Sequence, residues 1–348
     1  MAELHYETLD FWEEGDTVRV NLAKRFYTFI PKEELESIAP FQVDRHTLTF
    51  DCSQQRAELK FLTLLNQKMP DLKTIVTHNR AVYIHKNSGI PLIGNLSFGI
   101  IHRGTSIIEI KPLTSCNLDC IYCSVNEGLS SNQTDYFVER EYLMDEFKRI
   151  AEFVGIPVEA HIGVQGEPLV YAEFAELAQE LSDLPYVYRI TTDTNGTLLN
   201  KPLIDKLSKI PKLRLNVSLN AGDKEIASKM AGTTYNTAHV MDMLRYAADK
   251  MDVLVAPLYV PGYNDKELIK VIEFAKTLPQ KDYPMVGIQN FLNYSTGRNP
   301  VKQLDWDPFM NMLRELEKKT GMRLILDFKK DFHVEQTKQL PKPFKKGQ

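Results

Sequence analysis

Apolar and polar positions follow a regular pattern along residues 105–321, where short apolar runs alternate with longer amphipathic stretches. Short runs rich in Val, Ile and Leu predict buried strands. Stretches in which apolar residues recur three and four positions apart predict helices. The six strand–helix pairs predicted in this way are 106–112 with 139–155, 158–164 with 171–183, 187–194 with 200–210, 213–219 with a helical region ending at Lys250, 252–260 with 265–278, and 285–292 with 307–321.

Strands that are separated by helices favour parallel pairing with right-handed crossovers. We therefore predict an α/β fold in which residues 99–320 form a TIM-like (β/α)6 barrel, either closed or partial. In barrels of this kind the chemistry lies at the carboxyl ends of the strands. The functional residues are accordingly expected just after each predicted strand.

Residues 1–98 lack this alternation. Strands are predicted at 17–22 and 80–87, a helix at 54–69, and a turn-rich stretch at 86–95 closes the segment. This mixture predicts a small N-terminal α+β accessory domain. At the other end, residues 321–348 are predicted to form a basic C-terminal extension.

Composition narrows the class of protein. The chain is 43% hydrophobic and 25% charged, which is ordinary for a globular enzyme, and its net charge of −4 gives no global argument for nucleic-acid binding. Its acidic start does not resemble a signal peptide, and no apolar run approaches the roughly 18 residues of a membrane span. We predict a cytoplasmic protein with no membrane partner.

Three of the four cysteines, Cys116, Cys120 and Cys123, lie within eight residues directly after the first predicted strand. Soft thiolates favour zinc or an iron–sulfur cluster. A structural zinc site needs a fourth ligand, but the nearest upstream histidine, His102, precedes the strand and is expected at its opposite end. A [4Fe–4S] cluster held by three cysteines would leave one iron open for a substrate or cofactor. Unconnected cysteines on a loop remain the alternative.

The Cys-x3-Cys-x2-Cys spacing, with Tyr122 before the last cysteine, resembles the cluster-binding loop of the radical S-adenosylmethionine (radical SAM) superfamily. The resemblance implies a partial (β/α)6 barrel in which the three cysteines hold a [4Fe–4S] cluster and SAM binds the open iron. One-electron cleavage of SAM then yields a 5′-deoxyadenosyl radical that abstracts hydrogen from a substrate. The resemblance also implies that the enzyme acts under anaerobic conditions and receives its electron from a reductant such as ferredoxin or flavodoxin.

The segment after the second strand, Gly-Val-Gln-Gly-Glu-Pro at 163–168, resembles the superfamily's Gly-Gly-Glu-Pro stretch. The resemblance implies that backbone oxygens around Gly166 and the carboxylate of Glu167 receive the SAM ammonium group. Glycine would let the backbone approach the ligand closely. Gln165 replaces the first glycine of the pair, which leaves the geometry of this turn open.

Four further strand ends carry weaker similarities. Residues 191–200 resemble a Thr-Asn-Gly-Thr turn, although a simple turn with a helix N-cap explains them equally well. After the fourth strand, Ser218 and Asn220 match positions that reach the ribose or carboxylate of SAM. Residues 257–265 resemble the wall beside the adenine, which implies a contact from Val260. Gln289 and Asn290 are expected near the adenine edge.

Other candidates are less specific. One spare cysteine, Cys52, cannot hold a second cluster and is expected to be a small buried hydrophobe. Arg298, after the sixth strand, is either a contact for a substrate anion or the SAM carboxylate, or a solvated turn residue. Arg103 is expected to be structural. No acid–base catalytic residue is assigned, because the cofactor performs the difficult bond cleavage.

The C-terminal segment carries a local excess of positive charge. Such a patch could contact phosphates, although a solvated face is the commoner explanation. The end of the chain reads as a linker into a further domain, and the chain resembles uncharacterised archaeal radical SAM proteins, some of which continue into an RNA-binding TRAM-type β-barrel. The basic residues are Lys318, Lys319, Arg323, Lys329, Lys330, Lys338, Lys342, Lys345 and Lys346, against Asp327, Asp331 and Glu335.

Three functional hypotheses follow from the sequence. The first is a radical SAM enzyme that modifies a macromolecule, with RNA slightly ahead of a protein side chain. The second keeps the same chemistry and places it on a small metabolite. The third, from another class, is an iron–sulfur electron carrier or zinc-binding scaffold without SAM chemistry, and it predicts that SAM stays uncleaved under reducing conditions.

Overall fold

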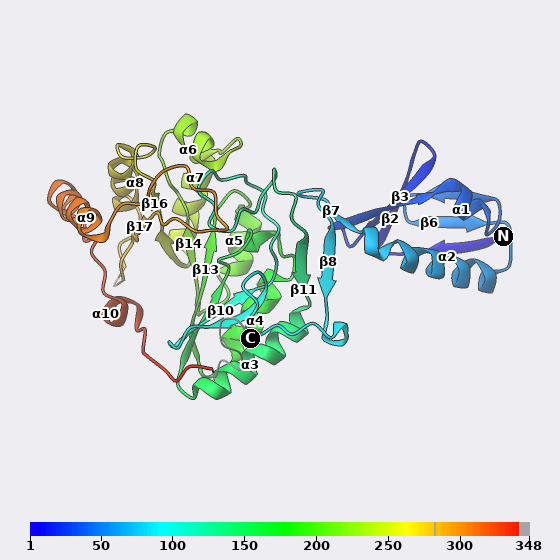
Figure 1. The fold of residues 1–348 in the computed structure, drawn as a ribbon, viewed down its shortest axis with the longest axis horizontal. Helices are drawn as coiled ribbons and strands as arrows, with labels where there is room; N and C mark the ends of the chain where they lie inside the picture. The colour runs from blue at the N-terminus through cyan, green and yellow to red at the C-terminus, as the bar shows by residue number, and fades with distance from the viewer. Residues whose placement is uncertain (282, 341–348) are drawn as a thin grey trace. The chain divides into compact units, whose positions relative to one another are not determined.

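The computed structural model describes residues 1–281 and 283–340, and its chain divides into two compact units. The first unit comprises Met1–Tyr83 and Ser131–Tyr136, and the second comprises Ile84–Ser130 and the chain from Phe137 onward (Figure 1). The division therefore falls earlier than the boundary near residue 98 that the sequence predicted. The reason is that the backbone N–H of Ile100 donates to the carbonyl of Leu92 at 2.8 Å, which ties residues before 98 to the second unit.

The first unit combines helices with two sheets whose strands pair antiparallel. A three-stranded sheet and a four-stranded sheet carry helices α1 (Lys32–Glu36) and α2 (Gln54–Lys68). The strand predicted at 17–22 and the helix predicted at 54–69 are confirmed by β3 and α2. In sheet order the strands are β1 (Ala2–His5), β6 (Thr47–Phe50) and β5 (Phe41–Asp44), and then β2 (Leu9–Glu14), β3 (Thr17–Leu22), β4 (Phe26–Pro31) and β7 (Lys73–Thr74).

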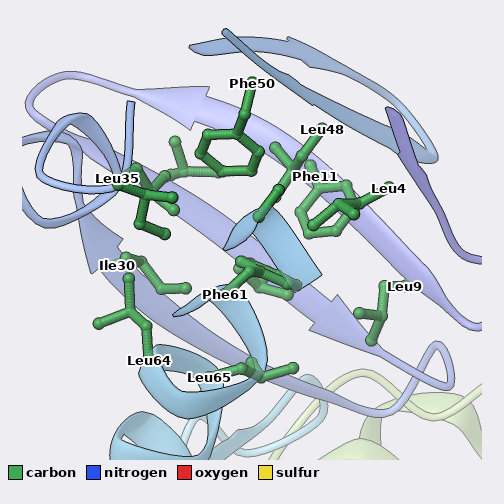
Figure 2. Close-up of a cluster of buried hydrophobic side chains, with 14 of the residues drawn as sticks. Leu4, Leu9, Phe11, Ile30, Leu35, Leu48, Phe50, Phe61, Leu64 and Leu65 are labelled. Carbon is green, nitrogen blue, oxygen red and sulfur yellow. The ribbon is translucent and has the colours of Figure 1, made fainter. Parts of the chain in front are cut away.

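A cluster of buried hydrophobic side chains, most of them aliphatic, fills the core of the first unit (Figure 2). Phe61 of α2 is fully buried, and its ring meets that of Phe11 edge-on with the ring centroids 5.9 Å apart. Offset and edge-on aromatic pairs add to the stabilisation that their buried area already provides. Cys52 packs against this cluster but is only partly buried, whereas the sequence predicted a buried small hydrophobe.

A six-stranded sheet organises the second unit. Its order is β15-β14-β13-β12-β10-β9, and every pairing is parallel except that of β9 with β10. The parallel pairing confirms the strand–helix pattern in the sequence. The strands are β9 (Gly99–His102), β10 (Ile107–Lys111), β12 (Val158–Ile162), β13 (Val187–Thr194), β14 (Leu213–Val217) and β15 (Asp252–Val255).

Beyond β15 the strands become short. β16 (Leu258–Tyr259) pairs in parallel with β17 (Gln289–Asn290), and Val255 bridges to Val286. The sixth predicted strand, 285–292, is therefore mostly irregular. β8 (Ala81–Ile84) and β11 (Asp135–Val138) form a separate pair.

The predicted helices of the second unit are all present. No described helix is long and apolar enough to cross a membrane. The helices that match the predictions are α3 (Arg140–Val154), α4 (Phe174–Asp183), α5 (Lys201–Leu207), α6 (Lys224–Ala231), α7 (Thr237–Ala248), α8 (Glu267–Lys276) and α9 (Trp306–Thr320). The short helix α10 (Phe328–Phe332) follows them.

The two faces of the six-stranded sheet differ in polarity, because successive side chains of a strand point to opposite faces. One face is apolar where α3 packs on β9 and β10, α4 on β13, and α7 on β15. The opposite face carries a row of mostly charged residues. In cross-strand register these are Glu109, His161, Thr191, Arg214 and Asp252. A sheet covered by apolar helix surfaces on both faces reads as apolar throughout, and this sheet does not. On its polar face the Arg214 guanidinium lies over the ring of Phe332 in α10.

The described part of the basic C-terminal extension packs on the second unit. The backbone N–H of Ser106 donates to the carbonyl of Glu335 at 2.8 Å, and that of Thr337 donates to Gly104 at 2.9 Å. Arg323 forms an ion pair with Asp331 at 2.6 Å, which neutralises part of the predicted basic patch. Three of its predicted lysines, Lys342, Lys345 and Lys346, lie outside the described residues.

We expect Phe61→Ala to destabilise the first unit by about 3–5 kcal/mol, because it removes a buried ring and leaves a cavity. Urea unfolding followed by Trp12 fluorescence in a Trp306→Phe background would measure this. Leu59, on the same helix, is 66% exposed, so Leu59→Ala is the matched control and should change the stability by less than about 1 kcal/mol. Equal losses in the two variants would contradict the prediction.

Candidate active site

A cavity of about 350 Å³ lies at the carboxyl ends of the parallel strands. Its walls come from loops that follow four strands of the six-stranded sheet and from the chain around β16 and β17. This is the location that the strand–helix pattern predicted. The predicted site residues that line it are Cys116, Cys120, Tyr122, Cys123, Gly166, Glu167, Ser218 and Gln289, together with Asn290.

The three predicted cysteine ligands all face this cavity from the loop after β10. Burial raises the pKa of the Cys116 thiol well above its usual range and that of Cys120 to about 12. Metal binding at this site would therefore release protons. His102 pairs with Ile108 near the start of β10, whereas the cysteine loop follows the end of that strand, so His102 does not line this cavity.

The three thiols supply the type of donor that an iron–sulfur cluster uses. Within residues 1–281 and 283–340, no three His, Cys, Asp or Glu side chains lie close enough together to hold one metal ion. A four-iron cluster is larger than one ion, so thiolates around it stand further apart. Three soft thiolates that share one cavity are the donor set that iron–sulfur clusters use.

Asn220, which the sequence predicted as a SAM contact, does not line the cavity but contacts Tyr122, which does. The side-chain amide of Asn220 donates to the Tyr122 hydroxyl, and its oxygen accepts from the backbone N–H of Leu258 at 2.8 Å. Val260 does not line the cavity either. It is fully buried and packs with Met230 and Phe291, so Asn220 and Val260 support the wall.

The turn after β12 can form only because residue 166 is glycine. Gly166 has φ +63°, and a Cβ atom there would lie 2.5 Å from the carbonyl oxygen of Ser115. The next residue, Glu167, donates its backbone N–H to that same carbonyl at 2.9 Å. Because Ser115 precedes Cys116, the turn packs directly against the start of the cysteine loop.

Gln165 takes the place of the superfamily's first glycine in this turn. Its side chain is buried, and its amide nitrogen lies 3.5 Å from a carboxylate oxygen of Glu127 in the cysteine loop. Val164 adopts φ +71°, which is an outlying conformation for a β-branched residue. Backbone strain of this kind tends to occur at functional sites.

Glu167 places a buried carboxylate at the cavity wall. Burial raises its pKa, and three hydrogen bonds to the ionised form oppose that effect. The carboxylate accepts from the backbone N–H of Leu169 at 3.0 Å, the hydroxyl of Thr194 at 2.7 Å and the backbone N–H of Asn195 at 2.8 Å. A carboxylate held in this way can receive a cationic group without moving.

The end of β13 and the turn after it belong to the segment 191–200, for which the sequence left two explanations open, a Thr-Asn-Gly-Thr resemblance or a simple turn with a helix N-cap. Asp193, Thr194 and Asn195 line the cavity, and the Asn195 amide donates to the side-chain oxygen of Asn117 in the cysteine loop at 2.9 Å. Asn200, the last residue of this segment, is the N-cap of α5. The helix N-cap is therefore confirmed, but it does not account for the three residues that line the cavity.

An ion pair connects the cavity wall with the polar face of the sheet. Nε2 of His161 lies 3.3 Å from Oδ2 of Asp193, and the Asn216 amide donates to Oδ1 of Asp193 at 2.9 Å. Burial acts to lower the pKa of His161, but the charge and hydrogen bond of Asp193, together with the charges of Glu159 and Glu109, outweigh it and raise the pKa to about 9. The His161 side chain is therefore a cation at neutral pH.

Neither arginine singled out from the sequence lines the cavity. Arg103 forms an ion pair with Glu109 at 2.6 Å, in agreement with its predicted structural role. Arg298 is neither a cavity contact nor a solvated turn residue. Its guanidinium lies on the cysteine loop, 2.7 Å from Oδ1 of Asp119.

Comparison with known proteins identifies related sequences. The family model of the radical SAM superfamily matches residues 110–275, which include the three cysteines and the turns after β12 and β13. The protein named uncharacterized protein MJ0103, from Methanocaldococcus jannaschii, is 36% identical over 92% of this chain and 78% of its own length. GTP 3′,8-cyclase from Aquifex aeolicus is 25% identical over 62% of this chain and 66% of the cyclase.

Solved structures give weaker matches. SuiB from Streptococcus suis, in a crystal structure bound to S-adenosylmethionine, is 13% identical with a TM-score of 0.49, over 92% of this chain and 71% of that chain. A likeness at this level carries no argument about the site. The assignment of this chain to a family therefore rests on the sequence matches alone.

We expect the charged form of His161 to stabilise the fold. Because its folded-state pKa of about 9 lies above the reference value of 6.5, this stabilisation is complete below pH 6.5 and is lost as the pH rises through 9. Between pH 7 and 9.5 the wild type should lose on the order of 1 kcal/mol more stability than His161→Gln in urea unfolding. His5→Gln, at an exposed histidine, is the control and should behave like the wild type. The same loss in His161→Gln would contradict the prediction.

Proposed function

This chain belongs to the radical SAM superfamily, and we propose that it uses a [4Fe–4S] cluster and SAM to abstract hydrogen from a substrate. When bound, the cluster and SAM supply a 5′-deoxyadenosyl radical, formed by one-electron cleavage of the sulfonium. The residues of the chain bind and orient these groups and exclude water. The observation that carries the proposal is that three thiols and the Gly166–Glu167 turn face one cavity at the strand ends.

In this proposal Cys116, Cys120 and Cys123 hold the cluster. Their support is a shared cavity and the packing of Gly166 on the residue before Cys116. The backbone N–H of Glu127 donates to the sulfur of Cys123 at 3.4 Å. Such a bond favours the thiolate that a cluster requires.

SAM would bind beside the cluster. Glu167 receives the ammonium group, since its carboxylate already faces the cavity and is fixed by three donors. Gly166 and Ser218 bring backbone and hydroxyl oxygens to the same wall, and Tyr122 and Gln289 line the remainder. Asn220 and Val260 act indirectly in this proposal, by supporting Tyr122 and Phe291 from behind.

The second unit would be an open (β/α)6 barrel. The polar face of the six-stranded sheet forms its inside, and the β16–β17 pair continues the curve beyond β15. An open barrel leaves a side through which a substrate can approach the cavity. A reductant such as ferredoxin or flavodoxin would deliver the electron.

The substrate class is limited by the charge of the cavity. Its lining includes Glu127, Glu167 and Asp193, and none of its described residues is Lys, Arg or His. A nucleotide phosphate would therefore bind outside the cavity. RNA or a protein side chain remains the first proposal and a small metabolite the second. The relative named GTP 3′,8-cyclase, whose name gives a nucleotide as substrate, supports the second.

Anaerobically reconstituted protein should convert SAM to 5′-deoxyadenosine when dithionite is added. The matched control is the Cys116→Ala, Cys120→Ala, Cys123→Ala triple variant, which should form no product because it cannot hold the cluster. Liquid chromatography of the quenched reaction measures the product. An intact wild-type cluster that leaves SAM uncleaved, with RNA, protein and metabolite fractions added in turn, would favour an electron carrier instead.

Glu167→Gln should weaken SAM binding by about 2 kcal/mol, roughly thirtyfold in Kd, because it removes the charge that receives the ammonium group. Anaerobic calorimetry on cluster-loaded protein measures the Kd. Glu141 on α3 is 62% exposed at its side chain and does not line the cavity, so Glu141→Gln should bind SAM like the wild type. An unchanged Kd in Glu167→Gln would remove Glu167 from the proposed site.

A further inference from the structure

The loop that carries the three cysteines has no helix or strand of its own between β10 and β11. Its backbone must therefore be held by other parts of the chain. One side is pinned by the end of α6, where the N–H groups of Asp119 and Ile121 donate to the carbonyls of Ala231 and Met230 at 2.9 and 3.0 Å. Within the loop, the N–H of Leu129 donates to Leu118 at 3.1 Å.

The other side of the loop is held by Arg298, which comes from the segment after β17. Its backbone N–H donates to the carbonyl of Cys123 at 2.8 Å. Its guanidinium donates to the carbonyl of Cys120 at 3.2 Å and to the side-chain oxygen of Asn126 at 2.7 Å. Two of the three cysteines thus present their backbone carbonyls to one residue.

The same guanidinium also closes the base of the loop. It pairs with Oδ1 of Asp119 at 2.7 Å and donates to the hydroxyl of Ser130 at 3.2 Å. Asp119 in turn accepts from the backbone N–H and the hydroxyl of Ser130 at 3.1 and 2.8 Å. The side chains of Arg298 and Asp119 are each only 19% exposed, so this network differs from a solvated surface ion pair of small worth.

The segment that presents Arg298 is itself rigidly built. The backbone N–H groups of Asn293 and Gln303 donate to each other's side-chain oxygens at 3.0 and 2.8 Å. The Asn299 amide donates to the carbonyl of Tyr294 at 2.8 Å. A Cβ atom at Gly297 would lie 3.0 Å from the carbonyl of Ser124, so this segment lies directly against the cysteine loop.

We propose that Arg298 is a positioning residue, which fixes the cysteine loop in the shape that receives the cluster and places a positive charge beside it. This inference rests on the proposed function, since it assigns the loop to a cluster. The planar guanidinium forms several hydrogen bonds in a fixed geometry, which a lysine ammonium cannot reproduce. A positive charge near a cluster stabilises its reduced form.

Four single variants test the proposal in the full chain. Arg298→Gln removes the charge and most of the side-chain bonds, Arg298→Lys keeps the charge alone, and Asp119→Asn removes the ion pair from the other partner. Lys302 is exposed and lies four residues further along, so Lys302→Gln is the charge-matched control. After anaerobic reconstitution, we would measure iron and sulfide per chain, the rate of iron loss to a chelator, and the cluster's reduction potential by EPR-monitored titration.

Arg298→Gln should lose iron to the chelator about tenfold faster than the wild type, as expected for the loss of a charged hydrogen-bond network, and its potential should become more negative. Arg298→Lys should also lose iron faster while keeping the wild-type potential, which separates the loop geometry from the charge. Asp119→Asn should lose iron faster as well. Lys302→Gln should match the wild type in all three measurements.

The proposal is overturned if Arg298→Gln and Lys302→Gln behave alike in iron content, chelation rate and potential while the wild type holds a cluster. A wild type that binds no cluster would overturn the proposed function first, and the inference with it. If Arg298→Gln fails to fold, which circular dichroism of the apo-protein would reveal, Arg298→Lys and Asp119→Asn decide the matter. Wild-type chelation rates in both would then overturn the proposal.

Discussion

Parallel pairing of β10, β12, β13 and β14 is the interaction on which the candidate site depends. It brings the carboxyl ends of four strands to one edge of the sheet, where the loops after them meet. Cys116 and Glu167 are far apart in the chain, yet the turn after β12 donates a backbone N–H to the residue before Cys116. A change in register between these strands would separate the thiols from the carboxylate.

Close packing between loops then sets the shape of the cavity. Gly166 has no room for a side chain beside Ser115, and Gly232 has none beside the carbonyl of Asp119, where a Cβ atom would lie 2.0 Å away. Asn195 and Asn117 join the turn after β13 to the cysteine loop. Interiors packed at this density transmit small displacements, so the cysteine loop depends on turns after several different strands, and Arg298 is one contact among several.

The polar face of the sheet gives the site its electrostatic setting. Asp193 lines the cavity and pairs with His161, which lies in the row of polar residues across β10 to β15. Charges buried in this way need partners, because an unpaired charge is costly to desolvate. The pairing keeps a negative group at the cavity wall and a positive group behind it, and the three carboxyl side chains of the lining suit a cationic cofactor such as SAM.

The sequence by itself determined the alternation of strands and helices from residue 106 to residue 278, the expectation of a site at the strand ends and the three cysteines. Periodicity and local spacing carry that information, since each depends on residues close together in the chain. Only the tertiary structure decided that Val260 and Asn220 support the wall and that Arg298 holds the cysteine loop. These roles depend on contacts between residues far apart in the chain, and such contacts leave no local pattern in the sequence.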